Sequence, residues 1–345
     1  MSLRVFGLVL ALGVEAAVTT CRSPGEADRS TPASAEPAAT VELAAADTSS
    51  LTAREHREWS TYVSELLAPC PDQPVSIAQC VREARPCKAC GPAAAFLVRQ
   101  VQKGQPRSKV EAAYRIRFAA DKVRAIDLSG SPSKGPDHAV VTLVEWADFE
   151  CPFCGAASPV LDQKVEAFPG KVRLVFKNYP LSSHPHAETA ARAAVAAKRQ
   201  GKFWEMHHAL FAAQETGLEK SRILKLARSI GLDLQKFQAD LESEAVADDV
   251  ARDRRAADAL ELSGTPLIYV NGRHFDLDYF GISEDLDDWI SLEVELKTGQ
   301  KVKPIALEPP ATASAFASAG SPPPPASGAK VSPDRKPAPP APSGR

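Results

Sequence analysis

The stretch VVTLVEWADFECPFC, from Val140 to Cys154, joins a run rich in β-branched residues to a Cys-x-x-Cys motif. The β-branched run predicts a strand, and the residues from Cys151 to about Ala167 predict a helix. The two thiols therefore lie where a strand passes into a helix N-terminus. Unpaired backbone N–H groups and the helix dipole favour negative charge at that position. A thiol held as thiolate is a nucleophile, and a second thiol within reach makes a redox centre.

The spacing of the two cysteines places both sulfurs on one face of the first helical turn. We expect Cys151 at the helix end to be exposed and Cys154 to be shielded. Cys151 would then attack a disulfide, and Cys154 would resolve the mixed disulfide. Pro152 suits the first turn because its missing N–H is not needed there. The alternatives are a structural disulfide, or half of a zinc site that would need further ligands.

The chain has 345 residues and a net charge of −2, which gives no case for nucleic acid or a general anionic surface as partner. Arg4 and the apolar run 5–14 predict an export signal over residues 1–20. That run is about half of what a membrane span needs, and no other stretch approaches the roughly 20 apolar residues of a span. We therefore expect an exported protein of the periplasm or cell envelope, where disulfides persist.

Cys21 follows the signal directly, after Val18-Thr-Thr20. This arrangement resembles the lipoprotein signal of bacteria, which implies an acylated Cys21 and membrane attachment through the lipid alone. Ordinary cleavage or an uncleaved anchor is the alternative. Residues 21–50 contain mostly Ala, Ser, Thr, Pro and Glu and predict a disordered tether. The Pro- and Ala-rich residues 301–345 predict a disordered tail.

Residues 51–122 predict a small helical module that contains four cysteines. Apolar residues recur at helical intervals over 54–67, before Gly104 and over 107–118. A module of this size buries little apolar surface by itself, which favours disulfides. Its four cysteines are Cys70, Cys80, Cys87 and Cys90. They could form two disulfides, bind zinc through four thiolates, or act as a thiol relay that serves Cys151.

The rest of the chain predicts a second strand, a block of helices, a hairpin and a last helix. The second strand covers 172–176, and the hairpin turns at Asn271-Gly272 between 267–270 and 273–275. The last helix begins at Asp285 and fades near Lys297. The helical block consists of 187–199, 203–214, 221–230, 234–241 and 246–260.

Four segments in this order, 145–154, 176–181, 200–207 and 264–266, resemble the DsbA-like branch of the thioredoxin fold. The resemblance covers about residues 126–297. It implies an α/β thioredoxin domain over 123–300 with an inserted helical block at about 187–260, preceded by the Cys-rich helical module.

The resemblance also implies roles for single residues. Cys151 would be the attacking thiol and Cys154 the resolving thiol, with Pro266 a cis-proline that faces them after Thr265. Phe153 stands where the strongest oxidant of the family has His, and Thr265 is common among isomerases and reductases. These two positions leave the direction of electron flow open. With Glu150 as a neighbouring like charge, we expect a Cys151 pKa below about 8.5 and above about 3.5.

The sequence therefore predicts a thiol–disulfide oxidoreductase that acts on exported proteins. Its partners would be protein thiols or disulfides and a redox partner protein, with no cofactor and no metal. A disulfide isomerase or reductase of the same fold is one alternative, and a non-catalytic client- or metal-binding protein is another. His184 and His186 predict cap and loop positions. His207 and His208 are adjacent in a helix and face different ways, so they form no common metal face.

Overall fold

The computed structural model describes residues 40–261 and 264–308. The predicted export signal, Cys21, residues 21–39 of the tether and the tail from residue 309 lie outside the described residues. The helices are α1 (Ala53–Glu65), α2 (Ile77–Arg82), α3 (Cys90–Gln102), α4 (Arg107–Phe118), α5 (Pro152–Ala167), α6 (Ala187–Lys198), α7 (Phe203–Ala213), α8 (Lys220–Ser229), α9 (Leu234–Glu242), α10 (Glu244–Asp258) and α11 (Ile282–Thr298). Two short 3-10 helices, η1 (Ala120–Lys122) and η2 (Gln214–Thr216), and five strands, β1 (Ser133–Lys134), β2 (Val141–Ala147), β3 (Val172–Asn178), β4 (Leu267–Val270) and β5 (Arg273–His274), complete the elements of the described residues.

The five strands form one sheet in the order β1-β3-β2-β4-β5. The central strands β2 and β3 are parallel, and Val141 pairs with Val172 at the start of their register. Parallel neighbours need a crossover connection, and α5 provides it. The remaining pairs are antiparallel. The sheet thus sets the end of β2 beside the start of α5, where the Cys-x-x-Cys motif lies.

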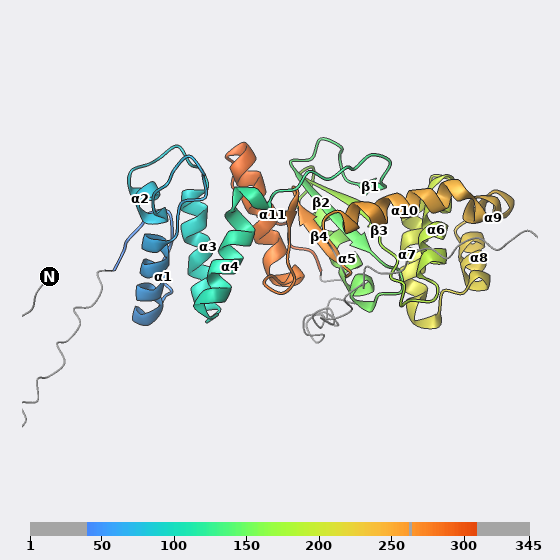
Figure 1. Cartoon of the computed structure of the whole chain (residues 1–345), viewed down its shortest axis with the longest axis horizontal. Coiled ribbons are helices and arrows are strands. Elements are labelled where there is room, and N and C mark those ends of the chain that lie inside the picture. Colours follow the sequence, from blue (N-terminus) through green and yellow to red (C-terminus); the bar gives the residue numbers. More distant parts are fainter. Residues whose placement is uncertain (1–39, 262–263, 309–345) are drawn as a thin grey trace, which may run out of the picture. The chain divides into compact units, whose positions relative to one another are not determined.

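Successive side chains of β2 point to opposite faces of the sheet, as expected for a strand. Val141 and Leu143 belong to the core that also contains residues of α5 and α11. Val144 and Trp146 belong to a second core that contains Ala257 of α10. Figure 1 shows α10 across the strands, in orange. By this alternation the side chain of Glu145 lies on the face that α5 covers.

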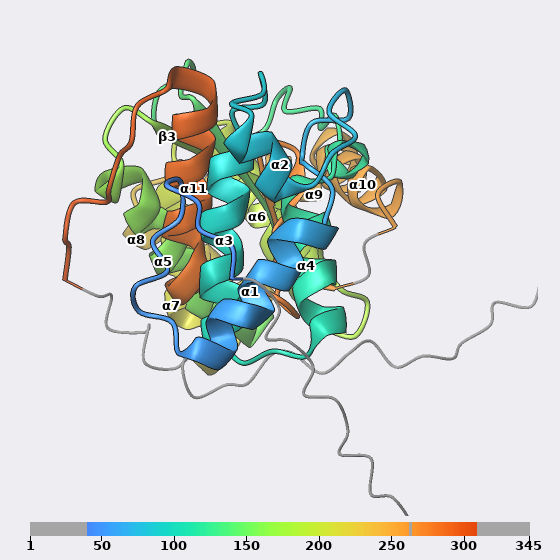
Figure 2. The same cartoon turned by 90° about the vertical axis from the view of Figure 1, so that its left-hand side faces the viewer.

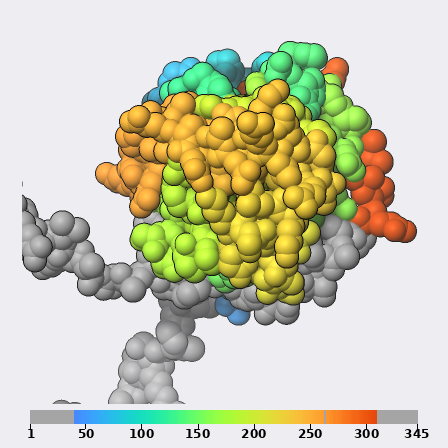
Figure 3. Space-filling model, turned by 90° about the vertical axis from the view of Figure 1, so that its right-hand side faces the viewer, coloured from blue at the N-terminus to red at the C-terminus, as the bar shows by residue number. Residues whose placement is uncertain are grey.

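Helices α6 to α10 form the inserted block, and Asp253 of α10 ties it to the sheet. The Asp253 carboxylate accepts hydrogen bonds from the backbone N–H of Asn178 at 3.1 Å and from Nζ of Lys177 at 3.3 Å. Its carbonyl O accepts from Nε1 of Trp146 at 3.0 Å. In Figure 3 the yellow and orange atoms of α8 to α10 form much of the face toward the viewer. The block is therefore fixed to the strand ends that lead into the site.

Helices α1 to α4 form the Cys-rich module, drawn in blue and green in Figures 1 and 2. Its cysteines form the disulfides Cys70–Cys87 and Cys80–Cys90. The module begins earlier than the sequence predicts, because residues 40–50 pack on it. Three small or medium apolar residues of this segment are buried in the core that includes α1 and α3, namely Val41, Leu43 and Ala46. The expected tether over 21–50 is therefore wrong for residues 40–50.

A buried ion pair joins the module to the last helix. Nη1 of Arg117 in α4 lies 2.9 Å from Oε1 of Glu293 in α11, and the Arg117 side chain is 2% exposed. The Arg117 guanidinium also lies over the Trp289 ring, 4.3 Å from its centroid. Nδ2 of Asn271 donates to the other Glu293 oxygen at 2.9 Å. The charges of both partners are thus paired and hydrogen-bonded, which a buried ion pair requires.

The last helix begins three residues before the predicted Asp285, because Gly281 provides its N-cap. Among residues 40–261 and 264–308, none of the helices is long and apolar enough to cross a membrane.

Candidate active site

Cys151 is the N-cap residue of α5, and Cys154 lies in the first turn of that helix. The backbone N–H groups of Cys154 and Gly155 donate to the carbonyl O of Cys151 at 3.0 and 3.1 Å. Both cysteines are free thiols. Cys151 is 4% exposed and Cys154 is fully buried. The expected exposure of Cys151 is therefore wrong, because its side chain packs in the apolar cluster that includes Phe149.

Thr265 and Pro266 face Cys151 from the segment before β4. The Thr265–Pro266 peptide bond is cis, and the Cys151 thiol donates to the carbonyl O of Thr265 at 3.4 Å. The Thr265 hydroxyl is buried and makes no hydrogen bond to the other described residues. The structure thus brings Cys151, Cys154, Thr265 and Pro266 together. In the motif itself, Pro152 is exposed and Phe153 is partly buried against the same apolar cluster.

The pKa of Cys151 is lowered to about 6. The largest cause is a hydrogen bond from the Cys154 thiol, which stabilises the thiolate. The backbone N–H groups of Cys154 and Phe153 act in the same direction, whereas burial opposes them. The value lies between the two limits expected from the sequence. At neutral pH, Cys151 is therefore largely a thiolate.

The pKa of Cys154 is raised well above its ordinary value, first by burial and then by its hydrogen bond to Cys151. The charge of Glu145 on β2 contributes to the same shift. Glu145 is 1% exposed, and neither of its carboxylate oxygens has a hydrogen-bond partner among the described residues. Burial, followed by the charges of Asp162 and Cys151, raises the pKa of Glu145 to about 8.

Glu145 was missed as a functional residue in the sequence. The signal that locates it is the alternation of β2, since Leu143 and Ala147 on either side of it are buried. A carboxyl group at such a position lies under α5 and beside the thiols. Its unpartnered oxygens and its raised pKa make it a group that exchanges a proton near neutral pH.

The acidic residues before Cys151 are turned toward the loop that follows β3. Oδ2 of Asp148 accepts from the Leu181 backbone N–H at 2.8 Å and lies 2.7 Å from Nδ1 of His184. Oε2 of Glu150 accepts from the His186 backbone N–H at 2.6 Å. The largest causes of the lowered Cys151 pKa are other groups, first of all the Cys154 thiol. The Glu150 carboxylate is thus held by this loop, and its effect on the Cys151 thiolate stays a prediction.

Gln214 in η2 also holds the motif, and no signal in the sequence pointed to it. Its Nε2 donates to the carbonyl O of Phe149 at 2.9 Å and to that of Cys151 at 2.8 Å. It comes from the helical insertion, 63 residues after Cys151 in the chain. Gln214 thus joins the helical insertion to the backbone carbonyl groups of Phe149 and Cys151.

The two histidines of α7 lie apart from the thiol chemistry. His207 is 1% exposed, and its ring lies 4.9 Å from Phe211 and 5.0 Å from Phe176 between centroids. Burial lowers its pKa to about 3, so it is neutral. His208 pairs with Asp162 at 2.7 Å. The expected separation of these two side chains agrees with their different partners.

A sheet with a parallel central pair, a Cys-x-x-Cys at the start of the crossover helix and a cis-proline beside it define a thioredoxin-type domain. Residues 142–287 match the family model described as DSBA-like thioredoxin domain. This part of the chain is therefore a DSBA-like thioredoxin domain, and the predicted fold class is confirmed.

Curated relatives match the same share of the chain. The protein named Na(+)/H(+) antiporter NhaA 3 of Salinispora tropica is 42% identical over 154 residues, which is 44% of this chain and 23% of the relative. Na(+)/H(+) antiporter NhaA of Herminiimonas arsenicoxydans is 39% identical over 146 residues, or 42% of this chain and 23% of the relative. The chain thus spans less than a quarter of the length of these two relatives.

Solved structures with similar folds include a thioredoxin-like oxidoreductase from Silicibacter pomeroyi, which is 33% identical with a TM-score of 0.38 over 42% of this chain and 83% of the other. BdbD from Bacillus subtilis in its oxidised form is 25% identical with a TM-score of 0.45 over 50% of this chain and 97% of the other.

Proposed function

We propose that this chain is a thiol–disulfide oxidoreductase that acts on exported proteins through Cys151 and Cys154. The observation that carries the proposal is the opposite shift of the two thiols. The pKa of Cys151 is lowered to about 6, whereas that of its hydrogen-bond donor Cys154 is raised well above its ordinary value. A disulfide exchange enzyme needs one thiolate that attacks the client disulfide and a second thiol that stays protonated until the mixed disulfide has formed.

The first step forms a mixed disulfide. The Cys151 thiolate attacks one sulfur of a client disulfide, the client S–S bond breaks, and the other client sulfur leaves as a thiolate. In the second step Cys154 gives up its proton and attacks Sγ of Cys151. The mixed disulfide breaks, the second client sulfur also leaves as a thiolate, both client thiolates take protons from water, and Cys151–Cys154 is a disulfide. The same steps in reverse oxidise a client dithiol, and a redox partner protein restores the starting state.

Glu145 is the group suited to receive the Cys154 proton. Its carboxylate is buried on the α5 face of β2, and its charge and the Cys154 thiolate destabilise each other. A carboxyl with a pKa of about 8 exchanges protons efficiently near neutral pH. The proton would thus move within the buried site without entry of bulk water.

Thr265 supplies the place for the client backbone. Its carbonyl O lies 3.4 Å from Sγ of Cys151 in the free protein. An extended client segment that replaces the thiol as donor would pair with this backbone as an added strand. Its cysteine would then lie against Cys151. Recognition of this kind depends on the main chain and accepts many sequences.

A trapping experiment tests the assignment of the two thiols. Cys154→Ser should accumulate covalent complexes with client proteins, because the mixed disulfide on Cys151 is no longer resolved. Cys151→Ser should form no such complexes and should lose disulfide exchange. Accumulation in Cys151→Ser alone would reverse the roles. A failure of Cys151 to react with an alkylating agent in the native protein would favour the non-catalytic alternative.

The direction of electron flow is tested by the reduction potential of the Cys151–Cys154 pair. A value near about −120 mV defines an oxidant and one near about −270 mV a reductant. We expect an intermediate value, because Cys151 has its pKa at about 6 rather than at the lowest values known for thiolates.

Export and lipid attachment at Cys21 are part of the proposal, supported by the signal-like residues 1–20. Mass spectrometry of the mature N-terminus tests both. A membrane-associated form that begins at an acylated Cys21 is expected. A soluble mature form that lacks Cys21 would exclude the anchor.

A further inference from the structure

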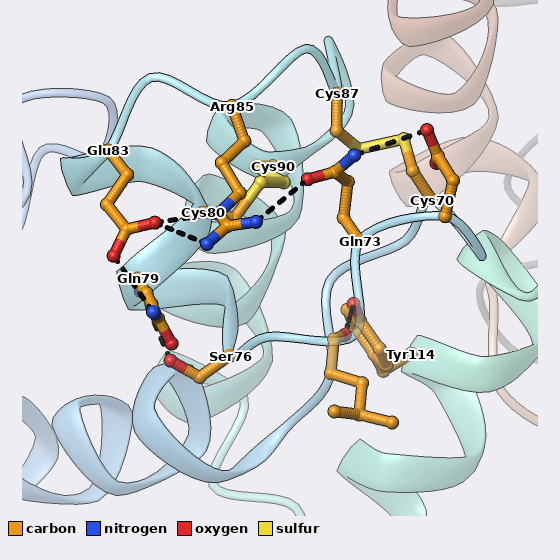
Figure 4. Close-up of a disulfide and its surroundings, with 12 residues drawn as sticks. Cys70, Gln73, Ser76, Gln79, Cys80, Glu83, Arg85, Cys87, Cys90 and Tyr114 are labelled. Carbon is orange, nitrogen blue, oxygen red and sulfur yellow. Dashed lines mark hydrogen bonds and ion pairs between the residues drawn. A yellow bond between two sulfur atoms is a disulfide. The ribbon is translucent and has the colours of Figure 1, made fainter.

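The Cys-rich module contains a cluster of sulfur atoms that the reaction at Cys151 does not use. The sulfurs of Cys80, Cys87 and Cys90 all lie within 4.8 Å of one another, although they belong to two different disulfides. Figure 4 shows the two disulfides beside each other, with Cys80 on α2 and Cys90 at the start of α3. Two neighbouring disulfides can exchange partners once one sulfur is freed.

Access to the cluster differs between its members. Cys80, Cys87 and Cys90 are 1%, 6% and 2% exposed and form an apolar cluster of their own. Cys70 is partly exposed and packs at the edge of that cluster, between Pro69 and Pro71. Cys70 is therefore the most exposed of the four cysteine residues and the one most open to an external thiol.

The backbone sets up the next exchange. The Cys90 N–H donates to the carbonyl O of Cys87 at 3.2 Å, so the chain from Cys87 to Cys90 is already turned back on itself. A thiolate freed at Cys87 therefore lies close to the Cys90 sulfur and needs only a side-chain rotation to attack it. The sulfur that this attack displaces is that of Cys80.

We propose that the module is a thiol-capture site in which a cysteine thiol bonds covalently to Cys70 while a disulfide forms between Cys87 and Cys90. An incoming thiolate attacks Cys70, the Cys70–Cys87 bond breaks, and the electron pair goes to Cys87. Cys87 attacks Cys90, the Cys80–Cys90 bond breaks, and Cys80 leaves as a thiolate that takes the proton of the incoming thiol. Two disulfides are present before and after, so the steps need no oxidant or reductant.

The buried position of Cys80 makes the capture persistent. Expulsion of the captured thiol requires a thiolate at Cys87, but the Cys87 sulfur is now bonded to Cys90. The free thiol has moved to Cys80 on α2, where burial in an apolar cluster disfavours the charged and nucleophilic form. The site thus holds a thiol-bearing molecule, whereas Cys151 and Cys154 turn over.

Mapping the products after reaction with glutathione tests the proposal. The full chain carries Cys151→Ser and Cys154→Ser, so the redox pair contributes nothing and the outcome is independent of the proposed function. After acid quench and alkylation, peptide mass mapping should find glutathione on Cys70, a Cys87–Cys90 disulfide and alkylated Cys80. Glutathione on Cys70 with alkylated Cys87 and an intact Cys80–Cys90 bond would overturn the exchange. The absence of any adduct would overturn the site.

Two single substitutions give a second and independent test. Cys70→Ser leaves Cys87 without its partner, and the free thiol should appear mainly at Cys80. Cys80→Ser leaves Cys90 without its partner, and the free thiol should appear at Cys70. Both variants should therefore contain the same Cys87–Cys90 disulfide. Free thiols that stay at Cys87 in the first variant and at Cys90 in the second would contradict the proposal. Circular dichroism would check that each variant is folded.

Discussion

The side-chain carbonyl of Gln214 occupies the space beside Gly155 where a larger residue would place its Cβ. A Cβ on residue 155 would lie 2.5 Å from Oε1 of Gln214, which is closer than van der Waals contact allows. The same Gln214 side chain donates to the carbonyl O of Cys151 at 2.8 Å. The absence of a side chain at residue 155 therefore permits the Gln214 amide to hold the backbone of Cys151.

The first prediction concerns this pair. Gln214→Ala should raise the Cys151 pKa, because the loop that sets the thiol against the N–H groups of α5 loses both of its amide hydrogen bonds. Gly155→Ala should raise it in the same way, since the new methyl group displaces Gln214. In the double variant, Gly155→Ala should add nothing. The ultraviolet absorbance of the thiolate as a function of pH measures each value, and additive shifts would contradict the coupling.

The second prediction concerns the proton of Glu145. An acid whose pKa is raised on folding holds its proton in the folded state after the unfolded chain has lost it. The ordinary value is 4.5 and the folded value about 8, so this group lowers stability as the pH rises between these two values. Glu145→Gln should remove that loss, and the difference in Tm between pH 5 and pH 8 should shrink by the corresponding amount.

This comparison of Tm values should be made in a protein that also carries Cys151→Ser. The lowered pKa of Cys151, about 6 against an ordinary 9, adds stability as the pH rises between these two values and so opposes the effect of Glu145 where the two ranges overlap. In the protein with both thiols, Glu145→Gln should also slow release of the mixed disulfide most strongly near neutral pH. An unchanged release rate would exclude Glu145 as the proton acceptor.

The third prediction concerns the residue between the thiols. Phe153→His should lower the Cys151 pKa, because an imidazole N–H would stabilise the thiolate where Phe153 offers only its backbone N–H. Each pKa unit corresponds to about 1.4 kcal/mol and about 30 mV in a two-electron potential. The variant should therefore be the stronger oxidant. Phe153→Leu is the matched control, and a rise of the pKa in Phe153→His would show that this position does not govern the site.

The fourth prediction concerns the junction of module and domain. Arg117→Ala should lower the free energy of unfolding by about 3–5 kcal/mol, because it leaves a buried charge on Glu293. Arg99→Ala removes an exposed ion pair with Asp288 and should cost less than about 1 kcal/mol. Denaturant unfolding measures both. Equal effects of the two substitutions would mean that the buried pair does not connect the two parts energetically.

The sequence predicted the features that depend on residues close to one another in the chain. Cys151 and Cys154 share a motif with their strand and helix, and the helices of the insertion begin and end within a few residues of the predicted bounds. Contacts between distant segments were not predictable in the same way. Gln214 reaches the motif from another helix, and nothing in its own neighbourhood in the sequence indicates this. The hydrogen-bond partner of the Cys151 thiol is likewise distant in sequence, since Thr265 lies 114 residues later in the chain.

For the predicted tether the sequence analysis was wrong in another way, because it predicted disorder where the chain is ordered. Composition alone predicted disorder over residues 21–50, because the segment contains few large apolar residues. Val41 and Leu43 are enough to pack residues 40–50 on the module, and the backbone N–H of Val41 donates to the Ser60 hydroxyl at 2.9 Å. The average composition of residues 21–50 does not reveal that the last of these residues pack against the helical module.

The buried pair of Arg117 and Glu293 bears on how portable the redox domain is. The segment that matches the family ends at residue 287, inside α11, whereas the pair and the rest of that helix lie beyond it. Excision at the family boundaries would split α11 and remove Ile290 and Val294, so the core residues of β2 and α5 that share their cluster would lose this covering. In this chain the folded unit thus extends beyond the segment that matches the family. A graft of the thiol chemistry into another protein would have to take the helical module with it.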